Sequence, residues 1–379
     1  KETTTVIYTP AIPADMGELV YFQTKGFELV KRAQALGKIS AAHTCLAVAG
    51  THGKTTTSSL LAHLFKSNGV DIAAFLGGIS TNYQSNFLPP GESDILVAEA
   101  DEYDRSFLQL QPAGGIITSV DSDHLDIYGN PEELTATFSK FRDCITDVAI
   151  VHKNTGLNGI TYGIETDSDY SGTNVRIENH AYVFDLKLPD GSLITDIHSG
   201  LPGRHNVENA IAAAALALNF GLSKEEVKAG IASFKGVRRR FEYHIKRDEL
   251  IYIDDYAHHP AEINALINSV RELYPNKKVT GIFQPHLYSR TRDFEEGFIE
   301  ALSKLDELIL MDIYPAREKP IPGISSSALF AKIDVANKHH LSATEILTHF
   351  ANNKPEVVLT IGAGDIDGII NPLKMKLSQ

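Results

Sequence analysis

Short apolar runs alternate along most of the chain with segments in which apolar positions recur every three or four residues. The runs predict buried strands, and the wider spacing predicts helices with one apolar face. The clearest examples are a strand at 45–49 with a helix that continues to about Lys66, and strands at 94–100 and 115–120. This alternation is typical of an α/β fold with mostly parallel strands.

Between residues 175 and 197 the pattern changes to a strict alternation of apolar and polar positions. The turn-forming sequence Pro189-Asp190-Gly191 interrupts it, so an antiparallel hairpin is predicted there. Two helices are predicted next, one at about 206–219 that Gly221 closes and one at 224–234.

The same patterns divide the chain into three parts. Residues 1–38 give a strand and a helix, at 5–8 and 27–36, which is too little for an independent domain and is interpreted as the end of one. Residues 39–235 form the predicted central domain. Residues 236–379 form a smaller doubly wound domain. Its predicted strands are 250–254, 278–283, 307–312 and 357–361.

Composition excludes several classes of protein. The 379 residues carry a net charge of -13, which would repel nucleic acid. Two cysteines, Cys45 and Cys144, cannot build a disulfide framework or a thiolate metal site. The longest apolar run, 210–218, is too short to span a bilayer, and the first residues do not resemble a signal peptide. A cytoplasmic protein without membrane insertion is therefore expected.

A glycine-rich segment lies between the strand at 45–49 and the helix after it. Its sequence is Gly50-Thr51-His52-Gly53-Lys54-Thr55-Thr56. Glycines let the backbone approach phosphate oxygens, and N–H groups at a helix start favour negative charge. Lys54 can bridge phosphates, and the Thr55 hydroxyl can bind Mg²⁺. Val48 occupies the first glycine position of the strict Walker pattern, but the coincidence of strand, glycines, Lys-Thr and helix favours phosphate binding over an accidental turn.

Acidic residues follow the next two strands, at 99–104 and 121–126. The carboxyl ends of parallel strands lie at one edge of a sheet, and carboxylate oxygens are the ligands that Mg²⁺ prefers. Glu99 is the best candidate ligand because it follows its strand directly. His124 is a weaker candidate, since histidine is not a typical magnesium ligand. The alternative is that most of these acids are solvated loop residues or helix caps.

The start of the helix at 206–219 carries two asparagines. Asn206 is placed as an ordinary helix cap. Asn209 lies one turn further on, where no structural role is evident from the sequence, and its amide offers both the donor and the acceptor that an adenine edge needs.

Polar clusters follow all four strands predicted in 236–379, at 254–260, 284–290, 314–318 and 362–365. Together they mark one crevice at the carboxyl ends of the strands. In this crevice Arg290 can hold a carboxylate with two parallel hydrogen bonds. His258 and His259 are adjacent in an extended segment and therefore point apart, which argues against a metal-binding pair.

Taken together, these segments resemble the muramyl (Mur) ligase family over nearly the whole chain. The motifs that carry the resemblance are Gly-Thr-His-Gly-Lys-Thr-Thr, Glu-Ala-Asp-Glu, Asp-His-Leu-Asp, Gly-Arg-His-Asn-Val-Glu-Asn, Arg-Arg-Phe-Glu (239–242) and Asp-Asp-Tyr-Ala-His-His-Pro. The resemblance implies a P-loop-type mononucleotide-binding central domain, a C-terminal Rossmann-like domain and the remnant of an N-terminal Rossmann-like domain that holds UDP.

The resemblance also implies an ATP-dependent amide-bond-forming ligase of peptidoglycan precursor synthesis. Three segments are similar to the family member that adds L-alanine to UDP-N-acetylmuramate: Asp-Asp-Tyr-Ala-His-His-Pro, Gln-Pro-His-Leu-Tyr-Ser-Arg-Thr-Arg and Tyr-Pro-Ala-Arg-Glu. In that reaction ATP converts the muramate carboxylate to an acyl phosphate, which the alanine amine attacks. A monomer or weak dimer is expected.

By position, the resemblance assigns a role to each motif. Lys54, His124, His258 and Arg290 are implied in catalysis, and Thr55, Glu99 and His124 in binding Mg²⁺. The implied ATP-binding residues are Gly50, Thr51, His52, Gly53, Lys54, Thr55, Thr56, His205, Asn206, Asn209 at adenine, Arg240, and Asp255 at the ribose. The implied substrate-binding residues are Tyr256, His258, His286 and Arg290.

The sequence departs from the family pattern at several places. Only the last portion of the UDP-binding domain is expected, in residues 1–38, and the connection at 153–157 is short. Leu287 stands where some relatives carry an arginine, and Lys140 is the nearest candidate for the carbamylated lysine of others. Alternatives from the same motifs are a ligase that recycles murein tripeptide, a folate-type polyglutamate ligase and a non-catalytic P-loop module.

Overall fold

The computed structural model describes residues 4–9, 12–121 and 130–378. Contacts divide the chain into two compact units. The first contains residues 1–175, 183–200 and 206–235, and the second contains 176–182, 201–205 and 236–379. The N-terminal segment groups with the central part in this division, and the assignment of three domains stays an interpretation of the sequence.

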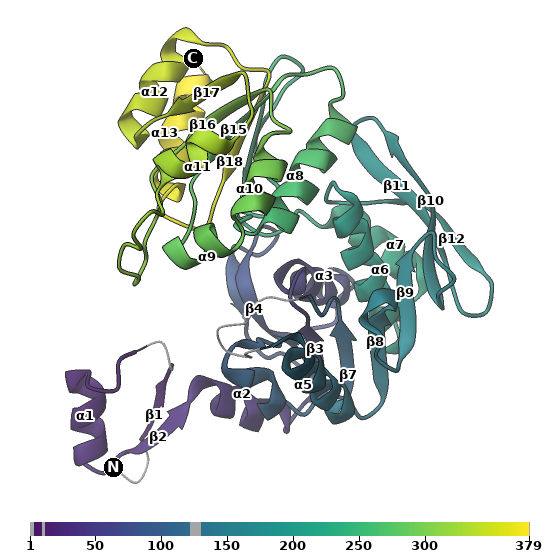
Figure 1. Cartoon of the computed structure of the whole chain (residues 1–379). Coiled ribbons are helices and arrows are strands. Elements are labelled where there is room, and N and C mark those ends of the chain that lie inside the picture. The colour runs from purple at the N-terminus through teal and green to yellow at the C-terminus, as the bar shows by residue number, and fades with distance from the viewer. Residues whose placement is uncertain (1–3, 10–11, 122–129, 379) are drawn as a thin grey trace. The chain divides into compact units, whose positions relative to one another are not determined.

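The N-terminal segment forms a small βαβ arrangement (Figure 1). Strand β1 (Thr5–Tyr8) and strand β2 (Glu28–Lys31) pair in parallel, and helix α1 (Gly17–Thr24) connects them. Helix α2 (Arg32–Ser40) follows. The strand predicted at 5–8 is confirmed. The helix predicted at 27–36 is wrong over its first residues, because β1 provides a hydrogen-bonding partner that local pattern does not reveal.

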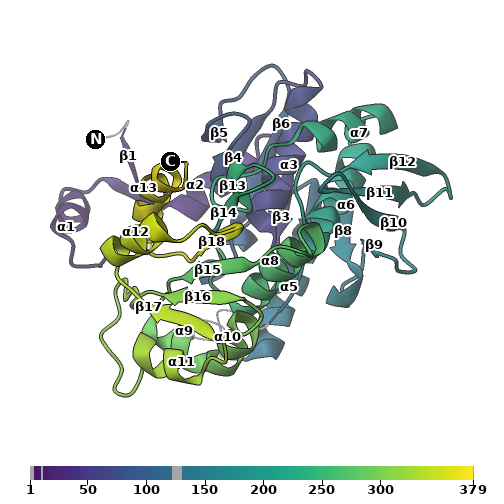
Figure 2. The same ribbon diagram turned by 90° about the horizontal axis from the view of Figure 1, so that it is seen from above.

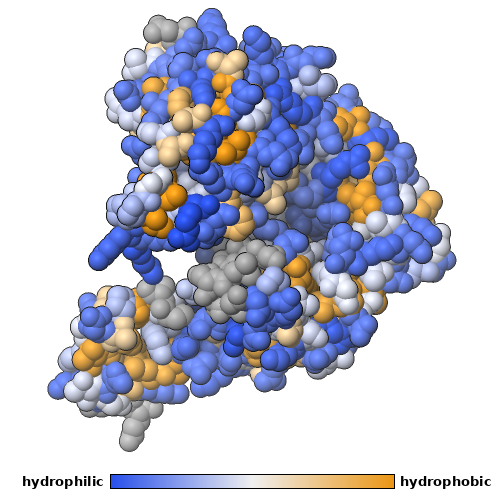
Figure 3. All heavy atoms as spheres, in the orientation of Figure 1, coloured by the Kyte–Doolittle hydropathy of each residue, from blue (hydrophilic) through white to orange (hydrophobic). Residues whose placement is uncertain are grey.

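Exposed apolar side chains gather on this segment, where the surface is orange at the lower left of Figure 3. The large ones are Ile7, Met16, Val20 and Tyr21. The segment therefore buries little apolar surface of its own.

The main sheet of the described chain has ten strands in the order β12-β11-β10-β9-β8-β7-β3-β6-β4-β5. Its central strands run parallel, and the pairs β4–β5 and β11–β12 are antiparallel. The strands are β3 (Thr44–Ala49), β4 (Ala73–Ser80), β5 (Ser85–Leu88), β6 (Ile95–Glu99), β7 (Gly114–Ile117), β8 (Val148–His152), β9 (Ile160–Ile164), β10 (Tyr170–Glu178), β11 (Ala181–Lys187) and β12 (Leu193–His198).

Much of this sheet agrees with the sequence pattern. The strands predicted at 45–49, 94–100 and 115–120 are confirmed as β3, β6 and β7. The predicted hairpin is β11–β12, and its turn contains Gly191 with φ 78°. Strands β4, β5, β8 and β9 were not predicted.

Helices of the first unit follow the strands of the sheet. They are α3 (Lys54–Ser67), the 3₁₀ helices η1 (Tyr103–Gln109) and η2 (Lys153–Thr155), α5 (Pro131–Cys144), α6 (Arg204–Asn219) and α7 (Lys224–Ser233). Helix α6 begins two residues before the predicted start, so Asn206 lies in its first turn and is not the cap. No helix among the described residues combines the length and the apolar composition that a membrane crossing needs.

The core of the first unit shows why β3 is a continuous apolar run. Alternate residues Cys45, Ala47 and Ala49 pack with the aromatic side chains of η1 and α5 on one face. The Phe107 and Phe141 rings stack with centroids 4.7 Å apart and an interplanar angle of 9°. Both faces of a parallel sheet are covered, and both must be apolar.

The second unit is built on a six-stranded sheet in the order β13-β14-β18-β15-β16-β17, with only β13 antiparallel to its neighbour. The strands are β13 (Glu242–Lys246), β14 (Ile251–Asp255), β15 (Val279–Phe283), β16 (Glu307–Leu310), β17 (Asn337–His340) and β18 (Val357–Ile361). All four predicted strands are confirmed. Edge strands β13 and β17 were missed, because neither is an apolar run.

Helices cover both faces of this sheet (Figure 2). On one face α12 (Ala343–Asn352) and α13 (Asp367–Leu377) pack against Tyr252, Ile282 and Val358. On the other lie α8 (Pro260–Leu273) and α10 (Glu295–Leu302), and the α10 ring of Phe298 contacts Phe283 at 5.5 Å. The remaining helices are α9 (Tyr288–Asp293) and α11 (Ser326–Lys332). This is the predicted Rossmann-like layering.

The stacked ring of Phe141 provides a test of the first unit's core. Replacing it in Phe141→Ala removes a fully buried side chain, which should lower the free energy of unfolding by about 3–5 kcal/mol. The matched control Phe87→Ala removes a ring that is 42% exposed and should cost less than about 1 kcal/mol. Urea unfolding of both variants measures the difference, and equal losses would contradict this packing.

Candidate functional site

The glycine-rich loop joins β3 to α3 and takes a backbone path that requires its two glycines. Gly50 has φ 138° and Gly53 has φ 81°, a region that favours glycine. A Cβ on Gly53 would lie 2.5 Å from Asn209 Oδ1, and one on Gly50 would lie 1.9 Å from Thr118 Oγ1. No side chain fits at either position.

Side chains beyond β7 hold the middle of the loop. The Thr51 and Ser119 hydroxyls are hydrogen-bonded at 2.8 Å, and the His52 N–H donates to Ser119 Oγ at 3.0 Å. The Asp121 N–H donates to Thr51 Oγ1 at 3.0 Å. Thr51 and His52 therefore fix the conformation of the loop by hydrogen bonds to the residues that follow β7.

Lys54, the first residue of α3, folds back over the loop. Its Nζ donates to Gly50 O at 2.6 Å and to Glu102 Oε1 at 2.8 Å. Burial raises the pKa of Glu102, and the Lys54 charge opposes that shift. The sequence analysis singled out Glu99 and missed Glu102, because the order Glu-Ala-Asp-Glu alone does not show which carboxylate turns toward the loop.

Glu99, at the end of β6, lies in a second set of donors. Its Oε1 accepts from Thr55 Oγ1 at 3.1 Å, and its Oε2 accepts from the Gly77 N–H at 3.0 Å. Ser58 Oγ is 3.4 Å from the same Oε2. A Cβ on Gly77 would lie 2.2 Å from Glu99 Oε1, so the absence of that atom leaves room for the carboxylate.

The structure therefore brings together Thr55 and Glu99, the two residues predicted as metal ligands. A hydroxyl and a carboxylate are hard oxygen donors of the kind that Mg²⁺ takes. This donor set fits the ion. The third predicted ligand, His124, lies outside the described residues.

Asn209 has a structural role that the sequence did not reveal. Its Oδ1 accepts from Thr57 Oγ1 at 3.1 Å, and its Nδ2 donates to Asn206 Oδ1 at 3.2 Å. The buried amide thus joins α6 to α3 directly below Gly53. Thr56 is also buried in the first turn of α3. The view that Asn209 lacks a structural role is corrected.

Residues predicted at the substrate side form a cluster in the second unit. Arg290 Nη1 donates to His286 Nδ1 at 3.3 Å, and the His286 ring stacks on Tyr314 with centroids 5.7 Å apart. The His258 and His286 rings lie 6.2 Å apart, and the Tyr256 and His258 rings 5.4 Å apart. The loops after β14 and β15 supply Tyr256, His258 and His286, and the following helix α9 supplies Arg290.

The adjacent histidines have different neighbours, as expected. His258 Nδ1 donates to Tyr256 O at 3.0 Å, whereas the His259 ring packs on Phe294 at 4.5 Å. His259 Nδ1 accepts from the Ala261 N–H and caps α8. His259 is therefore turned into the helix start.

Burial and the neighbouring Arg290 together keep His286 neutral. Arginine offers only donors, so His286 Nδ1 must accept and the imidazole must be neutral. Burial lowers the pKa of His286 to about 4, and the charges of His258 and Arg290 add to that effect. Arg290 therefore keeps its positive charge beside a neutral ring.

The predicted ribose contact, Asp255, ends β14. Its Oδ2 accepts from the Phe241 N–H and its Oδ1 from the Ala257 N–H, both at 2.7 Å. Burial raises the pKa of Asp255 to about 6, opposed by Arg240 and by these N–H groups. Each oxygen keeps a second lone pair, with which a ribose hydroxyl can form a hydrogen bond.

Arg240 and His205 complete the predicted set in the second unit, and Arg239 lies beside Arg240. The guanidinium groups of Arg239 and Arg240 each lie 5.2 Å from the Tyr256 ring centroid. Arg240 Nη1 is 3.8 Å from Glu262 Oε1. The His205 ring lies so close to Gly203 that a Cβ there would be 2.6 Å from it.

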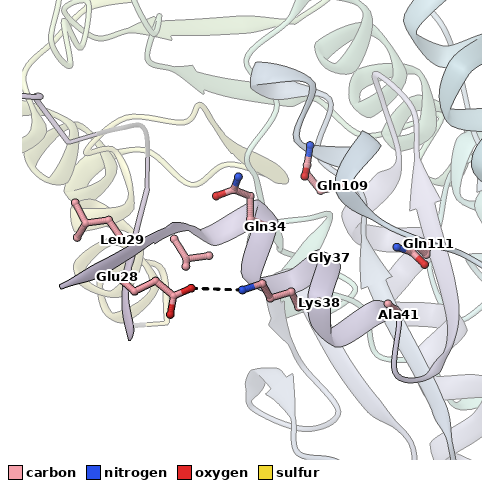
Figure 4. Close-up of a pocket in the computed structure, with 9 residues that line it drawn as sticks. Glu28, Leu29, Gln34, Gly37, Lys38, Ala41, Gln109 and Gln111 are labelled. Carbon is pink, nitrogen blue, oxygen red and sulfur yellow. Dashed lines mark ion pairs between the residues drawn. The ribbon is translucent and has the colours of Figure 1, made fainter. Parts of the chain in front are cut away.

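A hollow of about 520 Å³ lies in the first unit (Figure 4). Residues of β2, α2 and the end of η1 line it, and Lys38 Nζ is 3.6 Å from Glu28 Oε1 at its rim. It contains none of the residues predicted at the site. Lys140, the candidate for carbamylation, is exposed on α5.

Family models match both units of the chain. The Mur ligase middle domain matches residues 48–217, and the Mur ligase glutamate ligase domain matches residues 239–364. These matches identify the fold as that of an ATP-dependent ligase, and the glycine-rich loop, the Thr55–Glu99 pair and the Arg290 cluster agree with it. The chain belongs to the Mur ligase family.

Relatives within the family are more specific. The UDP-N-acetylmuramate–L-alanine ligase of Christiangramia forsetii is 49% identical over all of this chain and 83% of its own length. The enzyme of the same name from Parabacteroides distasonis is 49% identical over 98% of the chain and 83% of its length. The motif resemblance to the branch that uses L-alanine is thereby confirmed.

Solved structures agree. The crystal structure of UDP-N-acetylmuramate–alanine ligase from Thermotoga maritima has a TM-score of 0.84 and 26% identity, over 99% of this chain and 85% of that one. A MurF ligase from the same organism, solved in complex with ADP, has a TM-score of 0.72 and 17% identity, over 100% of this chain and 96% of that one. The second likeness concerns the fold alone.

The low pKa of His286 predicts a pH dependence. The pKa of a histidine in the unfolded chain is about 6.5. Between that value and about pH 4 the unfolded chain therefore binds a proton that folded His286 rejects, and the free energy of unfolding falls as pH falls. In His286→Gln the fall between pH 6.5 and 4 should be smaller, as measured by urea unfolding.

The ring resonance of His286, assigned by its loss in His286→Gln, reports the same group directly. It should titrate near pH 4 in the folded protein. A midpoint near pH 6.5 would show that Arg290 does not hold the ring neutral.

Proposed function

We propose that this chain catalyses the ATP-dependent ligation of L-alanine to the carboxylate of UDP-N-acetylmuramate, a step of peptidoglycan precursor synthesis. The observation that carries the proposal is the 49% identity over all 379 residues to a ligase of that name. The geometry of the loop, the Glu99 donors and the Arg290 cluster supplies the groups that the reaction needs.

A carboxylate does not react with an amine in water, so it must first be activated. The γ-phosphoryl group of ATP is transferred to the muramate carboxylate oxygen, which gives an acyl phosphate and ADP. The alanine nitrogen attacks the acyl carbon, and the resulting tetrahedral species releases phosphate as the amide forms. Both steps require charge neutralisation and positioning.

Residues of the first unit serve the phosphoryl transfer. Lys54 exchanges its contacts with Gly50 O and Glu102 for phosphate oxygens. Thr55 and Glu99 hold Mg²⁺, which neutralises phosphate charge, and His124 is proposed to hold a second ion. The loop residues from Gly50 to Thr56 surround the phosphates, and Asn206 and Asn209 are proposed near the adenine. His205, which belongs to the second unit, is the remaining residue of this group proposed for ATP binding.

Residues of the second unit serve the amino acid and the nucleoside. Arg290 binds the alanine carboxylate through two parallel N–H donors. Because His286 is neutral, Arg290 is the positive group of the pair. Tyr256 and His258 line the alanine site, and Arg240 and Asp255 contact the nucleotide.

The test is phosphate release by the complete protein with ATP, Mg²⁺ and UDP-N-acetylmuramate, while each amino acid is offered in turn. L-Alanine should give the highest kcat/KM. Lys54→Met should lower kcat by at least about 10²-fold, because it removes a charge that the transition state needs. Lys66→Met changes a lysine in the last turn of the same helix, 33% exposed and paired with Asp71, and should keep full activity.

Other outcomes contradict the proposal in distinct ways. Equal rates with glycine, serine and D-glutamate would remove the assignment of alanine. Release with murein tripeptide in place of alanine would identify a recycling ligase. ATP binding without phosphate release under any condition would identify a non-catalytic module.

Gly77→Ala tests the metal site without changing a ligand. The new Cβ would lie 2.2 Å from Glu99 Oε1, so the carboxylate must shift from the position in which it accepts from Thr55. The Mg²⁺ concentration needed for half-maximal activity should rise by about tenfold or more, within the range for disturbed outer-shell contacts. Gly17→Ala, where nothing lies within 4 Å of the new methyl group, is the control and should leave that concentration unchanged.

A further inference from the structure

Three potential metal ligands meet at one edge of the second unit, on residues that the proposed reaction does not use. Glu307 is the first residue of β16, His339 lies on the edge strand β17, and His349 lies on α12. One ligand atom from each lies within 4.8 Å of the other two. Glu307 Oε1 is 3.1 Å from His349 Nε2 and 3.6 Å from His339 Nε2.

We propose that Glu307, His339 and His349 form a binding site for one divalent transition-metal ion, with Zn²⁺ as the best match. Two imidazoles and one carboxylate are a set of three protein ligands that zinc takes with a fourth position left to solvent. Ca²⁺ and Mg²⁺ prefer sites made only of oxygen ligands, so the imidazole pair selects against them.

The distances fit a tetrahedral ion. Zinc bonds to nitrogen and oxygen at about 2.0–2.2 Å, which places neighbouring ligands about 3.3–3.6 Å apart. Of the two Glu307 contacts, the one of 3.6 Å lies at the upper limit of that range and the one of 3.1 Å lies slightly below it. The rings of His339 and His349 are 4.9 Å apart and inclined at 55°, so both nitrogens can turn toward a common point.

A hydrogen bond to its second oxygen orients the carboxylate of Glu307. Thr280 Oγ1 donates to Glu307 Oε2 at 2.8 Å, which leaves Oε1 toward the two imidazoles. Such outer-shell hydrogen bonds are typical of ligands that must keep one direction. Asn337 Oδ1 lies 3.0 Å from His339 Nε2, where it is either exchanged for the ion or available as a further oxygen ligand.

Exposure of the three side chains also suits an exchangeable ion. Glu307 and His349 are 17% and 14% exposed, whereas His339 is 37% exposed. Two of the three side chains are thus largely buried, and an ion would reach the site past the more exposed His339.

A second group of potential ligands, Glu242, His244 and Asp254, is a poorer candidate. The Arg239 guanidinium lies 3.1 Å from Asp254 Oδ2 and already places a positive charge there. Within the part of the chain that the structure describes, no arginine or lysine forms an ion pair with Glu307. A metal ion would therefore neutralise a carboxylate charge that no such side chain neutralises.

The ion would link three elements that are otherwise joined by short contacts. Strand β17 has only four residues, Asn-Lys-His-His, and pairs with β16 alone. Metal bonds from β16, β17 and α12 would hold this edge, so binding should stabilise the second unit by an amount that grows with the logarithm of the metal concentration.

The experiment is a Zn²⁺ titration of the complete, chelator-treated protein against a chromogenic chelator, with Mg²⁺ in excess to occupy oxygen sites. Wild type should bind one zinc that His349→Gln and the double variant His339→Gln/His349→Gln lose, with the affinity at least about 100-fold lower. His340→Gln is the matched control, because His340 follows His339 but pairs with Asp312 at 2.9 Å, and it should keep the zinc. Co²⁺ in place of zinc should give the intense visible absorption of a tetrahedral ion in wild type and in His340→Gln, but not in the double variant.

Thermal unfolding separates loss of metal from loss of fold. Without metal, wild type and the double variant should unfold at similar temperatures, and zinc should raise the midpoint in wild type alone. Equal zinc affinity in wild type and the double variant, or an equal rise in their midpoints, would overturn the proposal. Alanine-dependent phosphate release should persist in the double variant, so this outcome is independent of the proposed ligase activity.

Discussion

The ion pair between Lys54 and Glu102 is the interaction on which the first unit's site depends. The side chains are only 15% and 1% exposed, and buried charges of this kind are tolerated only when paired. The pair draws Lys54 back over Gly50, and the glycines permit that close path. Thr51 and Asn209 then anchor the loop to β7's continuation and to α6. The chain's own contacts therefore hold the glycine-rich loop in this conformation.

Sequence predicted the parts of this arrangement that local chemistry determines. The strand β3 is apolar on both faces, the glycines need special backbone angles, and Lys54 and Thr55 follow at once, so the loop between strand and helix could be predicted from the pattern. Glu102 and the role of Asn209 could not, because they depend on which side chains meet across 48 residues and 152 residues of sequence. For the same reason β2 was taken for helix, since its partner β1 lies more than twenty residues earlier.

The second unit shows the same division. Its four interior strands are apolar runs and were predicted, whereas β13 and β17 are edge strands whose residues are largely polar. The polar clusters after the strands were predicted to share a crevice, and the contacts among Tyr256, His258, His286 and Arg290 bring those residues together. What the pattern could not supply is the electrostatic state of the cluster, which follows from a donor-only guanidinium facing an imidazole nitrogen.

The contact between Gly53 and Asn209 constrains how this loop can vary. Shortening the amide to alanine would remove the atom 2.5 Å from a new Cβ, yet the φ of 81° would still cost any ordinary side chain about 1–2 kcal/mol. Replacement of Gly53 is therefore disfavoured for two reasons: the steric overlap with Asn209 and the positive φ. A compensating substitution in α6 removes only the steric overlap, so changes in the helix alone do not allow another residue to replace Gly53.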